Sequence, residues 1–203
     1  MFFLKPTQKE IFFKRGLPCD MAVFDILDTF SYQDNFTYII LNDLCLLNHI
    51  SKKREFVKHN FRKVYNLKYG LKNNVKNICL SKFNLYTGFL EPHIPAPYLK
   101  SSFEVIWDKF NDELHNACLD KFRSSHNSTE NLIRYYQMTT GKFVPINREK
   151  HGMYLTMSSK KLPSVIREQK TNMVCINYFD GDNVEEILKE FEKILPGKSS
   201  FEI

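Results

Sequence analysis

Apolar residues recur at helical spacing in several stretches of this chain. The clearest pattern runs from residue 101 to 118, where Ser101 and Glu104 have the spacing of a capping box at the start of a helix. The apolar face of this predicted helix comprises Phe103, Ile106, Trp107, Phe110, Leu114, Ala117 and Cys118. Two more amphipathic helices are predicted, from about Ser128 to Gly141 and from Asn183 to Pro196.

Two other helical patterns are shorter. Thr7 and Glu10 form a second capping box, and Gly16 follows the apolar group after it, so a short helix is predicted near the N-terminus. A basic amphipathic helix is predicted farther along, with Gly70 beyond its end. Its apolar stripe consists of Val57, Phe61, Val64 and Tyr65.

Short apolar runs mark the predicted strands. They are Met21–Phe24, Phe36–Leu41, Met153–Met157 and Met173–Ile176. The stretch Gly88–Pro97 contains three prolines and one glycine, which predicts an ordered loop instead of a regular element. Because strands alternate with helices, we expect an α/β fold that is helix-rich in its middle.

Composition favours a globular protein. The chain has 203 residues, of which 43% are hydrophobic, enough for one core in one domain or at most two small ones. The sequence has no run of eighteen apolar residues and its start does not resemble a signal peptide, so we expect a cytoplasmic protein. Its five cysteines form no CxxC pair, which argues against a disulfide framework or a zinc site and suggests buried thiols.

The net charge of +6 is concentrated in one segment. Between Ser51 and Lys82 the only acidic residue is Glu55. The basic residues there are Lys52, Lys53, Arg54, Lys58, Arg62, Lys63, Lys68, Lys72, Lys76 and Lys82. Such a segment suits nucleic acid, an anionic membrane surface or a phosphate-rich polymer, and it is equally typical of a solvated helix face.

Three local groups of residues could carry chemistry, although the P-loop, GxGxxG, GxSxG and HExxH motifs are absent. The first is His93, which lies between Pro92 and Pro95 in the predicted loop. A stiff loop can fix an imidazole whose ordinary pKa suits proton transfer near neutral pH. The alternative is a histidine with a purely structural role.

The second group is the polar link before the helix predicted at Ser128. Arg123 offers a planar fork for phosphate oxygens, and the hydroxyls of Ser124 and Ser125 offer further donors. Ordinary turn and capping chemistry explains the same residues.

The third group follows the last predicted strand, where the oxygens of Asn177, Asp180 and Asp182 could hold Mg²⁺ or Ca²⁺. The alternative there is a turn that leads into a helix cap.

Taken in order, several segments resemble conserved blocks of the Stealth family, which includes bacterial capsule phosphotransferases. The segments are Met1–Pro6 and Arg15–Asp20 for the second block, His93–Leu99, Phe122–Ser125 and Tyr135–Gln137 for the third, and Val174–Asn177, Phe191–Pro196 and Ser199–Glu202 for the fourth. The resemblance implies transfer of hexose-1-phosphate from a UDP-sugar to a sugar hydroxyl of a glycan acceptor. UMP is released in this reaction, and no nucleic-acid partner is implied.

The resemblance also implies roles for single residues. His93 corresponds to a general base that acts on the acceptor hydroxyl, and Arg123 corresponds to a clamp on the donor diphosphate, with Ser124 and Ser125 beside it. Asn177 matches a position near the donor or near a Mg²⁺ or Mn²⁺ cofactor. Tyr178 stands where the family usually has an acidic residue, so Asp180 or Asp182 would have to compensate.

From this resemblance we expect the chain to be the C-terminal part of one larger catalytic domain. Residues 1–50 would continue the second block, 51–87 would form the basic helical segment, 88–142 the third block and 172–203 the fourth. The family's acidic pair before the Met-Phe-Phe-Leu segment is missing. We therefore expect a truncated or split enzyme that pairs with a separately encoded N-terminal half, at the inner face of the membrane through peripheral contact. The alternative is a noncatalytic remnant that binds anionic glycan or membrane through its basic segment.

Overall fold

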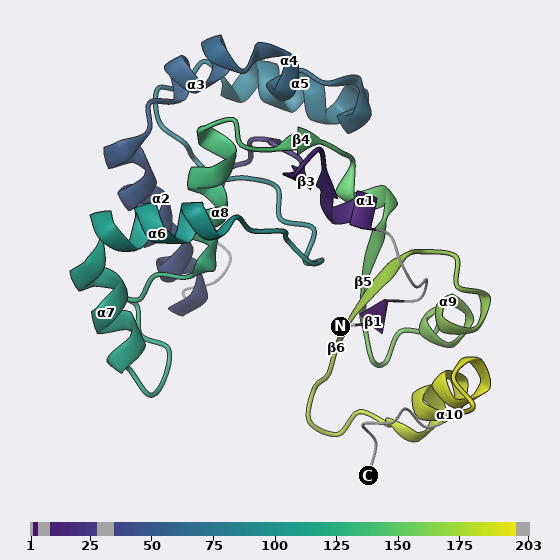
Figure 1. The fold of residues 1–203 in the computed structure, drawn as a ribbon. Helices are drawn as coiled ribbons and strands as arrows, with labels where there is room; N and C mark the ends of the chain where they lie inside the picture. Colours follow the sequence, from purple (N-terminus) through teal and green to yellow (C-terminus); the bar gives the residue numbers. More distant parts are fainter. Residues whose placement is uncertain (1, 4–8, 28–34, 198–203) are drawn as a thin grey trace. The chain divides into compact units, whose positions relative to one another are not determined.

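The computed structural model describes residues 2–3, 9–27 and 35–197, and these residues fall into two compact units (Figure 1). The first unit contains residues 2–3, Glu91–Pro95 and 148–197, and the second contains residues 9–27, 35–90 and 96–147. Both combine helices with small sheets, which confirms a helix-rich α/β fold. No helix in the described ranges is long and apolar enough to cross a membrane.

The first unit is built on a three-stranded sheet. Its strand order is β1 (Phe2–Phe3), β6 (Met173–Asn177) and β5 (Gly152–Thr156), with β5 and β6 parallel. A 3-10 turn, η2 (Arg148–Lys150), precedes β5. Helices α9 (Leu162–Glu168) and α10 (Glu185–Ile194) supply the rest of the unit.

One face of this sheet packs against the two helices. The buried cluster comprises Leu162, Val165, Ile166, Val174 and Ile187. Leu155 of β5 and Ile176 of β6 pack against this cluster. Because side chains alternate along a strand, Tyr154 and Thr156 of β5 and Asn177 of β6 lie on the opposite face. That opposite face is where the candidate site of this unit lies.

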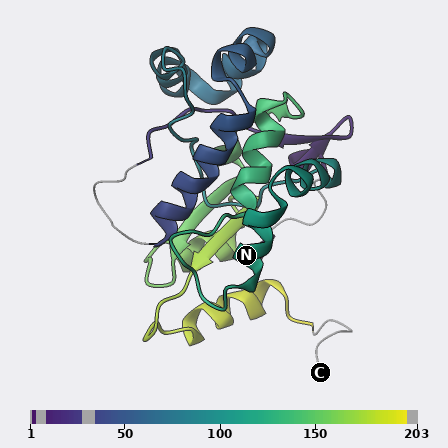
Figure 2. The same cartoon turned by 90° about the vertical axis from the view of Figure 1, so that its left-hand side faces the viewer.

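The second unit is mainly helical. Helices α2 (Asn35–Ile50), α6 (Lys100–Lys109) and α8 (Glu130–Thr139) pack together, and α2 lies beside α8 in both views (Figures 1 and 2). Its other helices are α1 (Lys9–Phe12), α3 (Lys53–His59), α4 (Phe61–Val64), α5 (Gly70–Leu80) and α7 (Asn111–Leu119), with a 3-10 turn η1 (Leu67–Tyr69). A small sheet has the strand order β2 (Phe13–Lys14), β3 (Leu17–Asp20) and β4 (Val144–Pro145).

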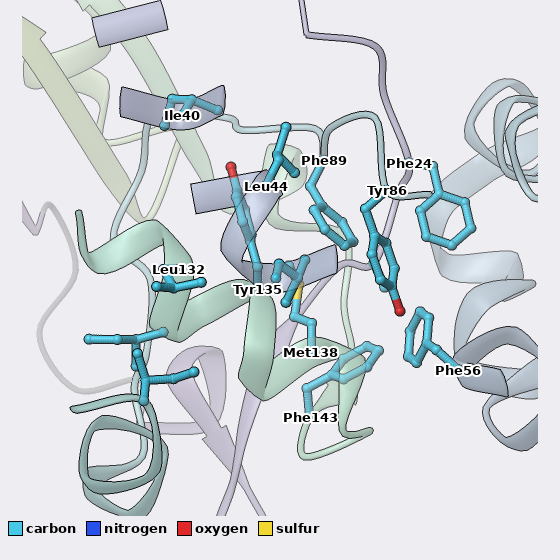
Figure 3. Close-up of a cluster of buried hydrophobic side chains, with 14 of the residues drawn as sticks. Phe24, Ile40, Leu44, Phe56, Tyr86, Phe89, Leu132, Tyr135, Met138 and Phe143 are labelled. Carbon is cyan, nitrogen blue, oxygen red and sulfur yellow. The ribbon is translucent and has the colours of Figure 1, made fainter. Parts of the chain in front are cut away.

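Aromatic side chains fill the core of the second unit (Figure 3). Phe89 stacks on Tyr135 of α8 with ring centroids 4.8 Å apart, and Phe24 meets Phe56 of α3 edge-to-face at 6.3 Å. Such pairs stabilise a core beyond the area that they bury, by about 0.5–1.5 kcal/mol each. The core therefore joins the extended segments around Phe24 and Phe89 to the helices of this unit.

A buried ion pair anchors α8 to the small sheet. Arg134 donates from Nε to Oδ2 of Asp20 at 2.8 Å and from Nη2 to Oδ1 at 2.7 Å, and both side chains are 0–1% exposed. The same Asp20 Oδ1 accepts the backbone N–H of Met21 at 2.7 Å. A bidentate pair of this kind fixes the direction of α8 because two bonds set both distance and angle.

The structure corrects several of the predicted elements. Phe36–Leu41 is not a strand but the first part of α2. The helical spacing appears only when the whole helix is considered, because its buried positions Ile40, Leu44 and Leu47 extend beyond the short apolar run. Met21–Val23 is buried but extended without a ladder, and only Phe24 forms a bridge, to Phe89. The predicted strands near Met153 and Met173 are confirmed as β5 and β6.

The long predicted helices are partly broken. The helix over 101–118 is two helices that meet at Phe110, and its capping box is wrong because the chain enters α6 at Leu99, before Ser101. The basic helix breaks after His59 and again after Val64. The loop over Gly88–Pro97 and the helices α8 and α10 are confirmed. The expectation of buried thiols is wrong for Cys45, Cys79 and Cys118, which are exposed.

Candidate functional site

His93 has an unusual backbone conformation. Its φ of 47° lies in the left-handed region, which a residue with a Cβ adopts at a cost of about 1–2 kcal/mol. Its side chain is exposed, and its ring lies 5.2 Å from the ring of Tyr154 on β5. Strain of this kind persists where the surrounding structure enforces it, and it is typical of functional positions.

The contacts of the loop show what enforces this conformation. Arg148, which is buried, donates from Nη2 to the backbone carbonyls of Ile94 at 2.6 Å and Pro95 at 2.9 Å. The buried side chain of Ile94 lies over Gly152 so closely that a Cβ there would be 2.5 Å from Ile94 Cγ2. Arg148 and the bare backbone of Gly152 therefore hold the loop against β5 and leave the imidazole outside.

Asn177 lies on the same sheet face as this loop. In the parallel register Tyr154 is paired with Cys175 and Thr156 with Asn177, so Tyr154 and Asn177 are diagonal neighbours on one face. The His93 ring therefore packs on a residue that shares with Asn177 the sheet face opposite α9 and α10.

The two aspartates after β6 form a turn. The backbone N–H of Phe179 donates to Asp182 Oδ2 at 2.9 Å, and Asp182 N–H donates back to the Phe179 carbonyl at 3.0 Å. Asn183 Oδ1 then accepts the N–H of Glu185, the first residue of α10, at 3.0 Å. Asp180 is exposed. In the described ranges there is no group of three or more His, Cys, Asp or Glu residues that could enclose a metal ion.

Arg123 lies in the second unit, in the link between α7 and α8. Its guanidinium lies 5.5 Å from the ring centre of Phe36, and its backbone carbonyl accepts a hydrogen bond from Asn35 Nδ2 at 3.1 Å. The side chain is exposed and leaves its donor fork accessible. Arg123 therefore belongs to the second unit and His93 to the first.

The two serines beside Arg123 are tied into the link. Ser124 Oγ donates to Asp120 Oδ2 at 2.9 Å, and Asn127 Nδ2 donates to the same oxygen at 2.8 Å. These two bonds lower the pKa of Asp120, the bond from Asn127 most. The Ser125 carbonyl accepts from Asn42 Nδ2 of α2 at 2.7 Å. The Ser124 hydroxyl therefore donates its hydrogen within this link.

Asp43 is a buried carboxyl group beneath this link. It is 0% exposed and accepts hydrogen bonds from Thr129 N–H at 3.1 Å and Thr129 Oγ1 at 2.6 Å. Burial raises its pKa to about 7, against the lowering effect of these bonds. Asp43 thus holds the start of α8, where Thr129 Oγ1 also accepts the N–H of Asn131.

We expect Asp43 to make stability depend on pH. The folded pKa of about 7 lies above the ordinary value of 3.8, so between these pH values the folded chain binds more protons than the unfolded chain. The free energy of unfolding should therefore fall as pH rises from about 4 to about 7, by roughly 2–4 kcal/mol from this group. In Asp43→Asn that component should vanish, as measured by urea unfolding across the pH range.

The matched control is Asp112→Asn, an exposed carboxylate on α7, which should leave the pH profile of stability unchanged. Parallel profiles for the wild-type chain and Asp43→Asn would show that folding leaves the pKa of Asp43 unchanged, contrary to this expectation.

Fewer basic side chains of the segment 51–82 are free to bind an anionic partner than its sequence indicates. Lys53 is fully buried and donates to the carbonyls of Leu80 and Leu85, and burial lowers its pKa to about 8. Four other lysines have protein partners. They are Lys52 with Glu55, Lys63 with the Gly141 carbonyl, Lys68 with the Pro145 carbonyl and Lys76 with Asp25. The exposed basic residues that remain include Lys58, Arg62, Lys72 and Lys82.

Sequence reasoning missed residues that position the site. Arg148 donates hydrogen bonds to the His93 loop, and Tyr154 contacts the His93 ring. Each lies more than fifty residues from the loop in sequence, and no sequence motif links them to it. Asp43 shows one usable signal, because an aspartate among apolar residues of a helix must find a partner if its face is buried.

Comparisons with known proteins give the same class of enzyme throughout. The sequence is 33% identical over 199 residues to a capsular polysaccharide phosphotransferase WcwK of Streptococcus pneumoniae, covering 94% of this chain and 58% of that protein. It is 31% identical to the exopolysaccharide phosphotransferase cps2G of Lactiplantibacillus plantarum, covering 97% and 59%. It is 28% identical to the receptor polysaccharide phosphotransferase WefC of Streptococcus gordonii, covering 100% and 62%.

The sequence matches no family model and no solved structure. The chain spans about three fifths of the length of these curated relatives. The resemblance to capsule phosphotransferases that its motifs indicate is confirmed. Over nearly its whole length, the chain is similar in sequence to bacterial capsular and exopolysaccharide phosphotransferases.

Proposed function

We propose that the chain takes part in transferring hexose-1-phosphate from a UDP-sugar to a hydroxyl group of a growing bacterial polysaccharide. The observation that carries this proposal is the conformation of His93, held exposed on a strained backbone on the sheet face that also carries Asn177. Phosphoryl transfer depends mainly on positioning and on charge stabilisation, and an imidazole held in one place can in addition take the proton of the acceptor hydroxyl.

In the proposed reaction, a ring nitrogen of His93 accepts the proton of the acceptor hydroxyl. The hydroxyl oxygen forms a bond to the phosphorus that carries the sugar, and the bond from that phosphorus to the oxygen of UMP breaks. UMP leaves, and a phosphodiester remains. Arg123, Ser124 and Ser125 are proposed to bind the donor, with the Arg123 guanidinium on diphosphate oxygens, and Asn177 is proposed as an amide ligand of the donor.

The family resemblance also implies Mg²⁺ or Mn²⁺. The residues described here do not fit a complete site, because Asp182 is occupied with its own turn, Asp180 is exposed and no third His, Cys, Asp or Glu joins them. We therefore assign no step to an ion. Any ion bound there would need ligands beyond Asn177, Asp180 and Asp182.

The test is release of UMP from a panel of UDP-sugars in the presence of an acceptor glycan. The assay is run with this chain alone and with the remaining portion of a WcwK protein added, each with Mg²⁺, with Mn²⁺ and with a chelator. We expect acceptor-dependent UMP release in at least one arm. If no donor gives UMP in either arm, or if the sugar is released without its phosphate, the proposed transfer is wrong.

We also propose that the reaction takes place at the inner face of the membrane through peripheral contact. The support is the exposed part of the basic segment, since Lys/Arg side chains near a bilayer are attracted by anionic headgroups. A polymer linked by phosphodiesters is anionic as well, so a binding experiment must separate lipid from glycan.

A further inference from the structure

Helix α5 turns its polar side toward the protein. Asn73 and Asn77 are both buried on its inner side. Asn77 Oδ1 accepts the backbone N–H of Phe24 at 2.7 Å, and its Nδ2 donates to the carbonyls of Ala22 at 3.0 Å and Val64 at 2.7 Å. These bonds fix the rotation of α5 about its axis, because a buried amide that loses its partners costs about 1–3 kcal/mol.

The side of α5 that faces outward is apolar. Leu71, Val75 and Ile78, at positions i, i+4 and i+7, expose 83%, 49% and 54% of their surface, and we name them the outer face of α5. Leu67 lies one helical turn earlier, in η1, and is 95% exposed. A surface helix of a globular protein normally has the reverse arrangement. The outer face of α5 is therefore an apolar stripe that the described residues leave uncovered.

Positive charges border this stripe. Lys72 follows Leu71 in α5, and Lys82 lies just beyond the end of the helix; both are exposed. Between residues 51 and 87 the only acidic residue is Glu55, which lies in α3. An apolar stripe bordered by lysines is typical of helices that lie in the headgroup region of anionic membranes.

We propose that the outer face of α5 docks on an anionic phospholipid surface, with its apolar side chains in the boundary of the acyl region and Lys72 and Lys82 among the headgroups. Because the rotation of α5 is fixed by Asn77, the stripe is presented without any conformational change. This inference rests on the membrane contact proposed above, and it does not depend on the transfer reaction.

A second copy of this chain fits the stripe less well. One helical stripe of three or four side chains is smaller than the roughly 800 Å² per partner of a stable interface. A symmetric contact through this stripe would also bring the lysines of the two copies near one another. The surrounding positive charge thus favours an anionic occupant.

The experiment is flotation of the full chain with vesicles of phosphatidylglycerol or of phosphatidylcholine. We expect binding to phosphatidylglycerol that weakens as salt rises, and little binding to phosphatidylcholine. The triple variant Leu71→Ser, Val75→Ser, Ile78→Ser should lose at least about tenfold in partition coefficient. Lys72→Gln with Lys82→Gln should lose about fivefold per lysine.

Matched controls use exposed residues of the same unit that lie outside α5. Leu119→Ser, which removes a 70% exposed leucine at the end of α7, and Lys109→Gln with Lys14→Gln should leave vesicle binding unchanged. A tryptophan placed by Leu71→Trp in a Trp107→Phe background should shift its emission to the blue on phosphatidylglycerol vesicles. Soluble capsule polymer should not produce this shift, whereas lipid should.

Several outcomes would overturn the inference. They are unchanged vesicle binding of the triple serine variant, an equal loss in the Leu119→Ser control, no blue shift of the tryptophan emission in the Leu71→Trp variant, or a wild-type dimer that the triple variant converts to a monomer without affecting vesicle binding. None of these readouts requires turnover, so failure of the inference and failure of the proposed transfer would be distinguished.

Discussion

Replacing Arg134 by methionine is expected to lower the free energy of unfolding of the second unit by about 3–5 kcal/mol. The substitution would leave the carboxylate of Asp20 buried without its cation, and Asp20 is 0% exposed. The shape of the side chain is roughly preserved, so the loss reports mainly on charge. Urea unfolding followed by the fluorescence of Trp107, which lies in α6 of the same unit, would measure it.

The double variant Asp20→Asn, Arg134→Met is expected to be more stable than Arg134→Met alone, because the unpaired charge is gone. The matched control is Lys100→Met, which breaks the exposed Lys100–Glu104 pair and should change stability by less than about 1 kcal/mol. If Arg134→Met unfolded at the same urea concentration as the wild-type chain, Asp20 would have to be neutral in the folded state.

The largest effect on activity is expected at His93. His93→Ala should lower the maximal rate of UMP release by about a hundredfold or more at saturating UDP-sugar, as loss of a general base does. Arg123→Ala should also raise the donor concentration needed for half-maximal rate, because it removes a diphosphate contact. Steady-state kinetics in whichever assay arm is active would separate the two effects.

Two variants separate chemistry from folding at this position. His93→Gly should be about 1–2 kcal/mol more stable than His93→Ala, since glycine adopts a φ of 47° without strain, but equally inactive. His115→Ala removes an exposed histidine of α7 and should retain full activity. A near-wild-type rate for His93→Ala would eliminate the proposed base.

The sequence predicts the parts of this fold that local patterns determine. β5, β6, α8 and α10 have capping residues, alternation or a complete apolar stripe, and they form where expected. The strand predicted over Phe36–Leu41 is wrong because a short apolar run is consistent with either a strand or a helix. Here the packing of the whole of α2 against α8 selects the helix. The breaks at Asn60 and Phe110 also depend on packing, which the periodicity alone does not contain.

The site was predictable only in part for the same reason. The two prolines around His93 indicate a stiff loop, but its left-handed conformation depends on Arg148 and on the absence of a Cβ at Gly152. The charge of the basic segment suggests more free cations than the fold leaves, because sequence does not show that Lys53 lies inside the core or that Lys76 pairs with Asp25. What sequence cannot supply is the set of contacts between residues far apart along the chain.

The interleaving of the two units has a consequence for fragments of this protein. The polypeptide leaves one unit for the other between β1 and α1, after Leu90, after Pro95 and after Asn147. A single cut therefore cannot yield either unit as one continuous piece. Excision of the second unit would have to delete Glu91–Pro95, the segment that carries His93, or take it out of its own unit. The loop proposed to hold the base thus belongs to the first unit but interrupts the sequence of the second, so a continuous fragment that contains all of the second unit also contains this loop.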